Sequence, residues 1–167
     1  MKKLTLLLFV AIIFSCSIVS CSYKLLPPTV IKTTGMKRGT ISDYTHFYIP
    51  QTETLKSGRT DVDWYTGSTY GQQKSVNPGD VITGFLAKKG FIKVSSTDDM
   101  SKKTLTINYG ESGRREVGLG GYTIEVTIQF IDSRTNTLVL TCVAEGIGPT
   151  EADDIRIAIN RCLESIF

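Results

Sequence analysis

The chain has little of the chemistry that catalysis and metal binding need. Its 167 residues include one histidine, His46, and four cysteines. We find no Ser-His-Asp constellation to place around His46 and no cysteine–histidine dyad. Cysteines that lack a partnering histidine at ligand spacing do not make a metal site either. We therefore expect a protein that is not an enzyme and that needs neither a metal nor a cofactor.

The chain also lacks an apolar run of the roughly 20 residues that a membrane-spanning helix needs. Lys2 and Lys3 instead precede a shorter, mostly apolar run over residues 4–15. This order of charged, apolar and small residues is typical of a secretory signal. The segment closes with Ile18-Val19-Ser20-Cys21, which resembles the lipobox of bacterial lipoproteins: a branched apolar residue, two more residues ending in a small one, then the cysteine that is acylated.

This resemblance implies a signal peptide over residues 1–20, lipidation of Cys21 and a short tether over residues 21–28. Two alternatives stay open, which are lipidation of Cys16 and ordinary signal-peptide cleavage without a lipid. In lipoproteins of enteric bacteria, an aspartate after the lipidated cysteine retains the protein in the inner membrane. Because Ser22 stands there, we expect a lipid anchor in the outer membrane with the protein facing the periplasm.

Removing residues 1–20 removes two lysines and no acidic residue, which lowers the net charge from +3 to +1. The basic character of the whole chain therefore comes mostly from the signal, and we expect no nucleic-acid partner. The remaining length suits one domain, which we place at residues 29–167.

Two cysteines, Cys142 and Cys162, lie on predicted apolar faces of a strand and a helix. The favoured interpretation is a pair of buried thiols. A disulfide that joins the last strand to the last helix is the alternative, because the envelope permits oxidation.

The first part of the domain looks β-like, with a short strand at Val30 and Ile31 and a better one over Tyr44–Pro50. In that strand His46 should share a face with Tyr44 and Tyr48. A lone histidine on a strand is more often structural than functional.

Residues 51–75 form a long polar stretch without periodicity, which predicts a loop. Trp64, Tyr65 and Tyr70 lie in it, and exposed aromatic rings of this kind stack on sugars or anchor protein partners. The alternative is that Trp64 and Tyr65 fold back and cover the edge of the sheet.

Asn77 and Pro78 predict the start of a helix that Gly90 ends. Gly84 in its middle suggests close approach to a neighbouring element. A strand over Phe91–Ser95 follows. If it runs parallel to the strand at Tyr44–Pro50, the helix is a right-handed crossover between the two strands.

Three strands with strict alternation of apolar and polar residues follow from Lys103 to Gly146, and a helix over Ala152–Phe167 ends the chain. Alternation with period two means one buried face and one wet face, so both helices must lie on the same side. The predicted fold class is α+β: a two-layer sandwich with a mostly antiparallel sheet and two helices on one face.

Between the first two of these strands, Gly110–Gly121 does not have the spacing of a phosphate-binding loop. We predict a long flexible hairpin tip that presents Arg114 and Arg115 to a partner or an anion, or to solvent. Asp153 and Asp154 begin the last helix, where acidic residues favour the helix dipole, and we assign them no catalytic role.

The lipobox, the strand ending at Ile49-Pro50, the helix before Gly90-Phe91 and the meander ending at Ala144-Glu145-Gly146 together resemble a known class. It is the small α+β envelope lipoproteins of uncharacterised function from Gram-negative bacteria. The layout is more distantly similar to accessory lipoproteins of curli secretion and of penicillin-binding-protein activation. The resemblance implies binding or assembly and supplies no catalytic residue.

Two functions from different classes follow. The first is a non-enzymatic lipoprotein that docks to another envelope protein through the wet face of the sheet, the Gly110–Gly121 tip or the Trp64 loop. The second is a glycan- or small-ligand-binding module that uses Trp64, Tyr65 and Tyr70.

Overall fold

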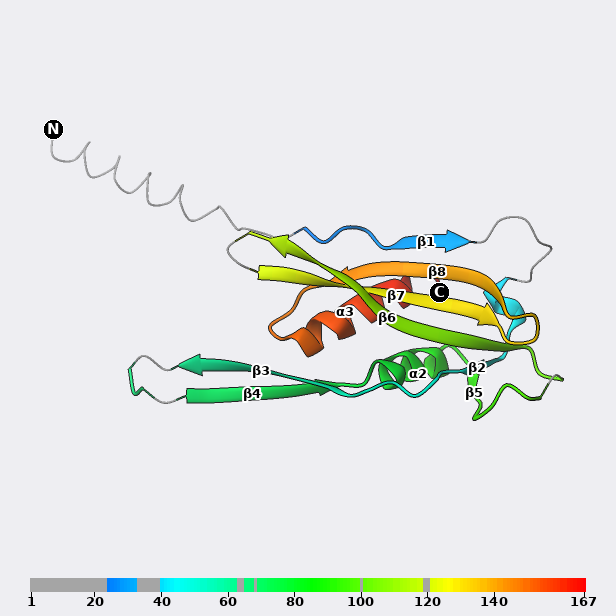
Figure 1. Cartoon of the computed structure of the whole chain (residues 1–167), viewed down its shortest axis with the longest axis horizontal. Coiled ribbons are helices and arrows are strands. Elements are labelled where there is room, and N and C mark those ends of the chain that lie inside the picture. Colours follow the sequence, from blue (N-terminus) through cyan, green and yellow to red (C-terminus); the bar gives the residue numbers. More distant parts are fainter. Residues whose placement is uncertain (1–23, 33–39, 63–64, 68, 100, 119–120) are drawn as a thin grey trace, which may run out of the picture.

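The computed structural model describes residues 24–32, 40–62, 65–67, 69–99, 101–118 and 121–167 (Figure 1). These residues form eight strands, two α-helices and one 3-10 turn, η1. Their order is β1 (Thr29–Lys32), η1 (Ile41–Asp43), β2 (His46–Tyr48), β3 (Leu55–Val62), β4 (Thr69–Val76), α2 (Pro78–Lys88), β5 (Ile92–Lys93), β6 (Thr104–Val117), β7 (Gly121–Asp132), β8 (Thr137–Gly146) and α3 (Glu151–Glu164).

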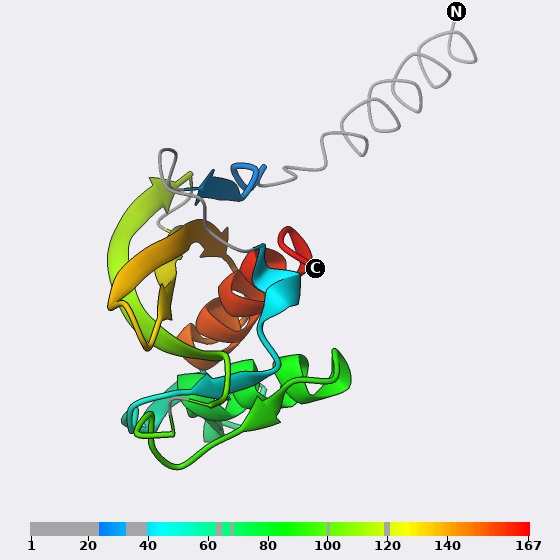
Figure 2. The same cartoon turned by 90° about the vertical axis from the view of Figure 1, so that its right-hand side faces the viewer.

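Six strands form one sheet in the order β1-β8-β7-β6-β2-β5, and β3 pairs only with β4. The neighbours from β1 to β6 are antiparallel, whereas β2 runs parallel to both β5 and β6. The sheet curves around α3, and α2 lies beside α3 near β2 and β5 (Figure 2). The α+β class and the antiparallel meander are confirmed. The parallel pairing of β2 with β5 makes α2 part of a crossover between these two strands.

The core lies between the meander and α3 because both elements present apolar residues at matching periods. Ile124, Val126, Ile128 and Phe130 of β7 are all fully buried. On α3, an apolar face at Ile155, Ala158, Ile159, Cys162 and Leu163 is buried as well. Thr150 caps this helix by accepting from the Asp153 amide, which confirms its predicted start.

Close backbone approach occurs at Gly146 and not at Gly84, which corrects the prediction. A Cβ at Gly146 would lie 1.9 Å from the Asp154 carbonyl oxygen, whereas one at Gly84 would meet nothing within 4 Å. Gly84 is exposed on the outer side of α2. The glycine at the end of β8 therefore sets the distance between the sheet and α3.

The prediction of a loop over residues 51–75 was wrong. Most of it is the hairpin β3–β4, in which all eight residues of β3 pair with β4. Its strands carry polar residues on both faces, so they lack the alternation that marks a strand packed on a core. The hairpin contacts α3 through Ser57, whose hydroxyl accepts from the Ala152 amide at 2.9 Å.

The prediction of a long flexible hairpin tip over Gly110–Gly121 was also wrong. β6 continues to Val117 and β7 begins at Gly121, so most of the predicted tip is paired strand. The pairing register shifts between Glu111 and Gly113. Such an irregularity interrupts the alternation of apolar and polar residues by which a strand is recognised in a sequence.

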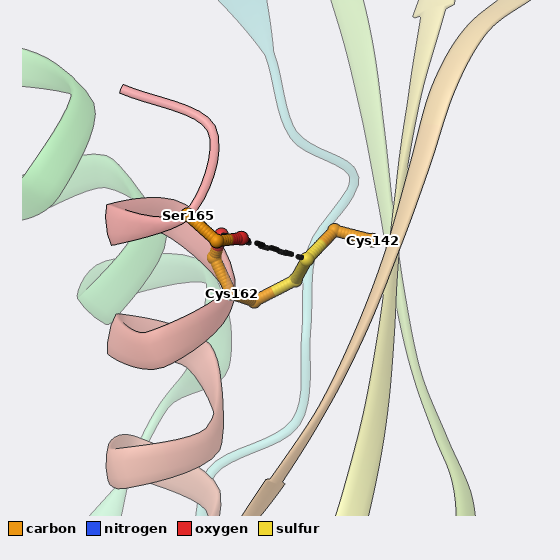
Figure 3. The surroundings of a disulfide bond; sticks show 3 residues. All are labelled: Cys142, Cys162 and Ser165. Carbon is orange, nitrogen blue, oxygen red and sulfur yellow. Dashed lines mark hydrogen bonds between the residues drawn. A yellow bond between two sulfur atoms is a disulfide. The ribbon is translucent and has the colours of Figure 1, made fainter. Parts of the chain in front are cut away.

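Cys142 and Cys162 form a disulfide between β8 and α3, contrary to the favoured interpretation of two free thiols (Figure 3). The hydroxyl of Ser165 lies 3.6 Å from the Cys142 sulfur and donates to the Cys162 carbonyl at 2.6 Å. Buried positions on apolar faces suit two free thiols and a disulfide equally well. The sequence pattern therefore could not distinguish the two interpretations.

The strand around His46 is shorter than predicted. Phe47 and Ile49 are buried. Tyr44, which was predicted to share a face with His46, lies before the strand and is buried, whereas His46 is half-buried. The Tyr44 hydroxyl donates to Asp132 at 2.9 Å, and burial together with this carboxylate raises the pKa of Tyr44 to about 12.

Candidate functional site

The end of the tether is held by the domain. The backbone amide of Leu26 donates to the Glu145 carboxylate at 3.2 Å, and the Leu26 carbonyl accepts from the Arg161 guanidinium at 2.7 Å. Arg161 also donates to the backbone carbonyl of Glu145. Both backbone polar groups of one tether residue are thus bonded to β8 and α3.

The Glu145 carboxylate is itself paired with Arg115 of β6. Two nitrogens of the guanidinium donate to its two oxygens, each at 2.7 Å, in the bidentate geometry that makes such pairs strong. The Glu145 side chain is only 6% exposed, so an unpaired charge there would be costly. The bond from Arg115, followed by that from the Leu26 amide, lowers the pKa of Glu145. We call Arg115, Glu145 and Arg161 the tether clamp.

Arg114 points to the other face of β6 and contacts the start of α3. Its guanidinium pairs with Glu151 and lies 4.9 Å from the centre of the Tyr122 ring. Its side chain is 53% exposed. Each arginine of the predicted tip is therefore bound to an acidic residue, and the side chain of Arg114 is the more exposed of the two, at 53% against 40% for Arg115.

The two aspartates at the start of α3 have opposite environments. Asp153 accepts from Lys74 of β4 at 2.8 Å, and this bond lowers its pKa. Asp154 is buried and accepts from the Gly148 amide, and burial raises its pKa to about 6. Both carboxylates have structural partners that fix the helix start, the β3–β4 hairpin and the segment after β8.

The candidate aromatic residues are described only in part. Tyr65 lies in the turn between β3 and β4 and is 81% exposed. Tyr70 pairs with Asp61 in the backbone ladder of that hairpin. Trp64 and Cys21 lie outside the described residues.

The face of the meander opposite α3 has an uncharged centre. Register pairs Asn108 with Gln129 and Gln129 with Thr141, and Thr127 pairs with Val143. These side chains are half-buried or exposed, and Figure 2 shows no described element packed against this side. We call these five residues the outer sheet face.

An open, mostly polar groove of about 850 Å³ lies between residues 49–54, the start of α2 and Lys93. Its central polar groups bond to each other: the Thr52 hydroxyl donates to Asn77 at 2.6 Å and accepts from the Gly79 amide at 2.9 Å. These bonds give the groove a structural role in capping α2. In the described ranges, no three histidine, cysteine, aspartate or glutamate side chains gather where they would hold a metal ion.

No protein family matches the chain, and no curated protein sequence does. The fold is similar to that of a PelC dodecamer from Paraburkholderia phytofirmans, at 12% identity and a TM-score of 0.47, over 83% of this chain and 98% of the other. A PelC variant from the same organism matches at 11% identity and a TM-score of 0.44, over 83% and 94% of the two chains. Within the described part of the chain, no helix has the length and apolar character to span a bilayer.

Sequence reasoning missed the tether clamp. Glu145 stands near the end of an otherwise apolar strand, and a charge there needs a partner, which was the available signal. The identity of the partners was not readable, because Leu26, Arg115 and Arg161 are separated from Glu145 by 119, 30 and 16 positions.

Proposed function

We propose that this chain is a lipid-anchored protein of the bacterial envelope, attached through Cys21 to the outer membrane and facing the periplasm, that binds another envelope protein without catalysing a reaction. The observation that carries the proposal is the lipobox-like Ile18-Val19-Ser20-Cys21 followed, five residues after the cysteine, by a backbone clamp on Leu26. A chain that is bound again so soon after its anchor holds the domain close to the membrane.

The anchor is tested by metabolic labelling with a radioactive fatty acid in a Gram-negative host. The wild-type protein should take up the label and Cys21→Ser should not, while Cys16→Ser should label as the wild type does. Labelling that persists in Cys21→Ser would refute the assignment.

For the docking role, the outer sheet face offers the best-suited surface. Its uncharged threonine, asparagine and glutamine side chains bury at a lower desolvation cost than charged side chains would, and they can donate and accept hydrogen bonds. Protein interfaces are depleted in charge at their centre, as this face is.

Photo-crosslinkers at Asn108 and Gln129 test this surface in intact cells, with Lys88 on α2 as the matched control. We expect one discrete protein adduct from the two sheet positions and none from Lys88. Equal adducts from all three positions, or none from any, would contradict docking through the outer sheet face.

The exposure of Tyr65 favours a second candidate, a glycan-binding module at the β3–β4 turn with Trp64 and Tyr70. Under this hypothesis the fluorescence of Trp64, the only tryptophan, responds to envelope glycans, and Tyr65→Ala weakens the response while Tyr122→Ala does not. A flat titration of the wild-type protein would count against it.

A further inference from the structure

The tether clamp has a geometric consequence beyond attachment. Since the amide and the carbonyl of Leu26 are both bonded to the domain, the direction in which the chain leaves toward Cys21 is set by β8 and α3. The five residue-to-residue steps from Cys21 to Leu26 span at most about 17 Å when fully extended. A lipid on Cys21 therefore keeps one particular end of the domain near the bilayer.

Figure 1 shows which end this is. The described chain enters beside the end of β6 and the start of β7, and the end of β3 and the start of β4 point the same way. The turn between β7 and β8 and the loop that follows β5 lie at the opposite end. The two ends therefore differ in their expected distance from the membrane, which makes the orientation measurable.

The end beside the tether carries side chains suited to a lipid headgroup layer. Arg114 is 53% exposed and lies over Tyr122, itself 39% exposed, and Lys24 of the tether is exposed as well. Glu151 occupies one terminal nitrogen of Arg114, and a guanidinium has five N–H donors in all. The remaining donors are free to reach a phosphate, and an amphipathic aromatic ring beside them is typical of the membrane interface.

We propose that the tether clamp stands the domain on the membrane with the adjoining ends of β6 and β7 against the lipid headgroups, where Arg114 binds the phosphate of an anionic lipid. This inference rests on the proposed lipidation of Cys21. In this orientation the outer sheet face lies beside the membrane contact and points along the bilayer. It is therefore open to a partner in the same membrane.

The orientation is tested with the full-length lipidated protein in vesicles of phosphatidylethanolamine and phosphatidylglycerol that carry a nitroxide quencher in the headgroup. A fluorophore is attached at Gly118→Cys in the β6–β7 turn or at Asp98→Cys at the opposite end. Both positions are exposed, and a Cβ at Gly118 would meet nothing within 4 Å. Labelling is specific because Cys142 and Cys162 are paired and Cys21 is blocked by its lipid.

We expect the Gly118 probe to lose several-fold more of its emission than the Asp98 probe. Equal quenching of the two probes on vesicles that carry the protein would overturn the orientation and leave the anchor intact. A protein that does not float with the vesicles would instead overturn the lipidation on which both proposals rest.

The clamp is tested with Arg161→Met, which removes the donor to Leu26 and keeps the aliphatic bulk, against Arg156→Met on the exposed side of the same helix. We expect Arg161→Met to reduce the difference between the two probes and Arg156→Met to leave it unchanged, at equal unfolding midpoints. An unchanged difference in Arg161→Met would contradict the role of the clamp. If that variant unfolds, the comparison of probes in the wild-type protein still decides the orientation.

The phosphate contact is tested with Arg114→Gln against Arg134→Gln, an exposed arginine at the far end. Replacing phosphatidylglycerol with phosphatidylcholine should weaken quenching at Gly118 in the wild type and in Arg134→Gln, because an arginine near an anionic surface is worth about 1 kcal/mol, or roughly fivefold in binding. Arg114→Gln should show weak quenching in both lipids. If Arg114→Gln responds to the lipid as the wild type does, Arg114 does not bind the headgroup.

Discussion

The meander with α3 and the β3–β4 hairpin are both built on antiparallel pairs, but different forces hold them in place. The meander buries a continuous row of apolar side chains against α3 and is joined to it by a disulfide. Among the hairpin side chains that the structure describes, only Val76 is buried. The hairpin is held to α3 by polar contacts, from Ser57 to Ala152 and from Lys74 to Asp153.

This difference implies that the two regions open at different free energies. Burial of apolar surface is worth about 25 cal/mol per Å², whereas partly exposed ion pairs contribute about 0–1 kcal/mol each. We therefore expect the meander and α3 to unfold as one unit and the hairpin to open before it.

The largest effect should come from Gly146→Ala at the contact between β8 and α3. The new Cβ would lie 1.9 Å from the Asp154 carbonyl oxygen and 2.7 Å from the Ala158 nitrogen, and both are backbone atoms. We expect a loss of about 3 kcal/mol or more in the free energy of unfolding, measured by urea denaturation. Gly84→Ala is the matched control and should gain about 0.5–1 kcal/mol, because it removes a glycine from an open position in a helix. Equal effects of the two substitutions would contradict the close packing at Gly146.

Removing the disulfide tests the same interface without crowding it. The double variant Cys142→Ala/Cys162→Ala loses a crosslink between positions 20 residues apart, and loop-closure entropy then favours the unfolded chain by about 3 kcal/mol. Urea denaturation of the oxidised wild type and of this variant measures the difference. A wild-type midpoint that is the same with and without reductant would show that the two cysteines are not paired in solution.

Titration of Asp154 should make the interface less stable as pH rises. Burial raises the pKa of Asp154 to about 6, above its unfolded value of 3.8. Its stabilising contribution is therefore complete below about pH 4 and is lost as pH rises through 6. Asp154→Asn should remove this slope and gain about 1–2 kcal/mol at pH 7, since an amide keeps an acceptor for the Gly148 amide without the buried charge.

The contribution of Asp153 to stability should change with pH in the opposite direction, and Asp153→Asn tests this. The bond from Lys74 lowers the pKa of Asp153, so its contribution is present at neutral pH and is lost as pH falls below its ordinary range. This variant should be less stable than the wild type at pH 7. Denaturation curves of the wild type and of each variant between pH 2 and 7 give the difference in unfolding free energy that each substitution causes. Differences that change with pH in the same direction for both variants would contradict the assignment.

The smallest effect should come from the hairpin. Ser57→Ala removes the acceptor for the Ala152 amide and should cost about 1 kcal/mol. Hydrogen exchange should speed up in β3 and β4 and stay unchanged in β7. Ser75→Ala, which replaces an exposed side chain of β4, is the control. Faster exchange in β7 as well would mean that the hairpin and the meander unfold together.

The same comparison explains which sequence predictions held. In β7 and α3, apolar residues recur at the strand and helix periods, and each local pattern agrees with the packing. In β3 and β4 only the paired Leu55 and Val76 at one end of the hairpin reach the core. The rest of the hairpin forms because the two strands pair with each other and bond to α3 through polar groups. Prediction from apolar periodicity therefore identified the core elements and missed the β3–β4 hairpin.

Candidate site residues divide in a similar way. Arg114 and Arg115 were found from their charge and their position near a turn, but their partners Glu151 and Glu145 were not, because pairing across three elements leaves no local pattern. The aromatic group was found from composition, and the exposure of Tyr65 agrees with a binding role that stays a prediction.

The amino-acid sequence by itself determined the fold class, the meander, both helices with their caps and the lipobox-like segment, because each depends on residues a few positions apart. Only the tertiary structure decided that Cys142 meets Cys162, that Gly146 is the point of closest approach and that Glu145 gathers Arg115, Arg161 and Leu26. These contacts join segments from different elements, and their energies depend on burial and geometry that exist only once the sheet has curved around α3.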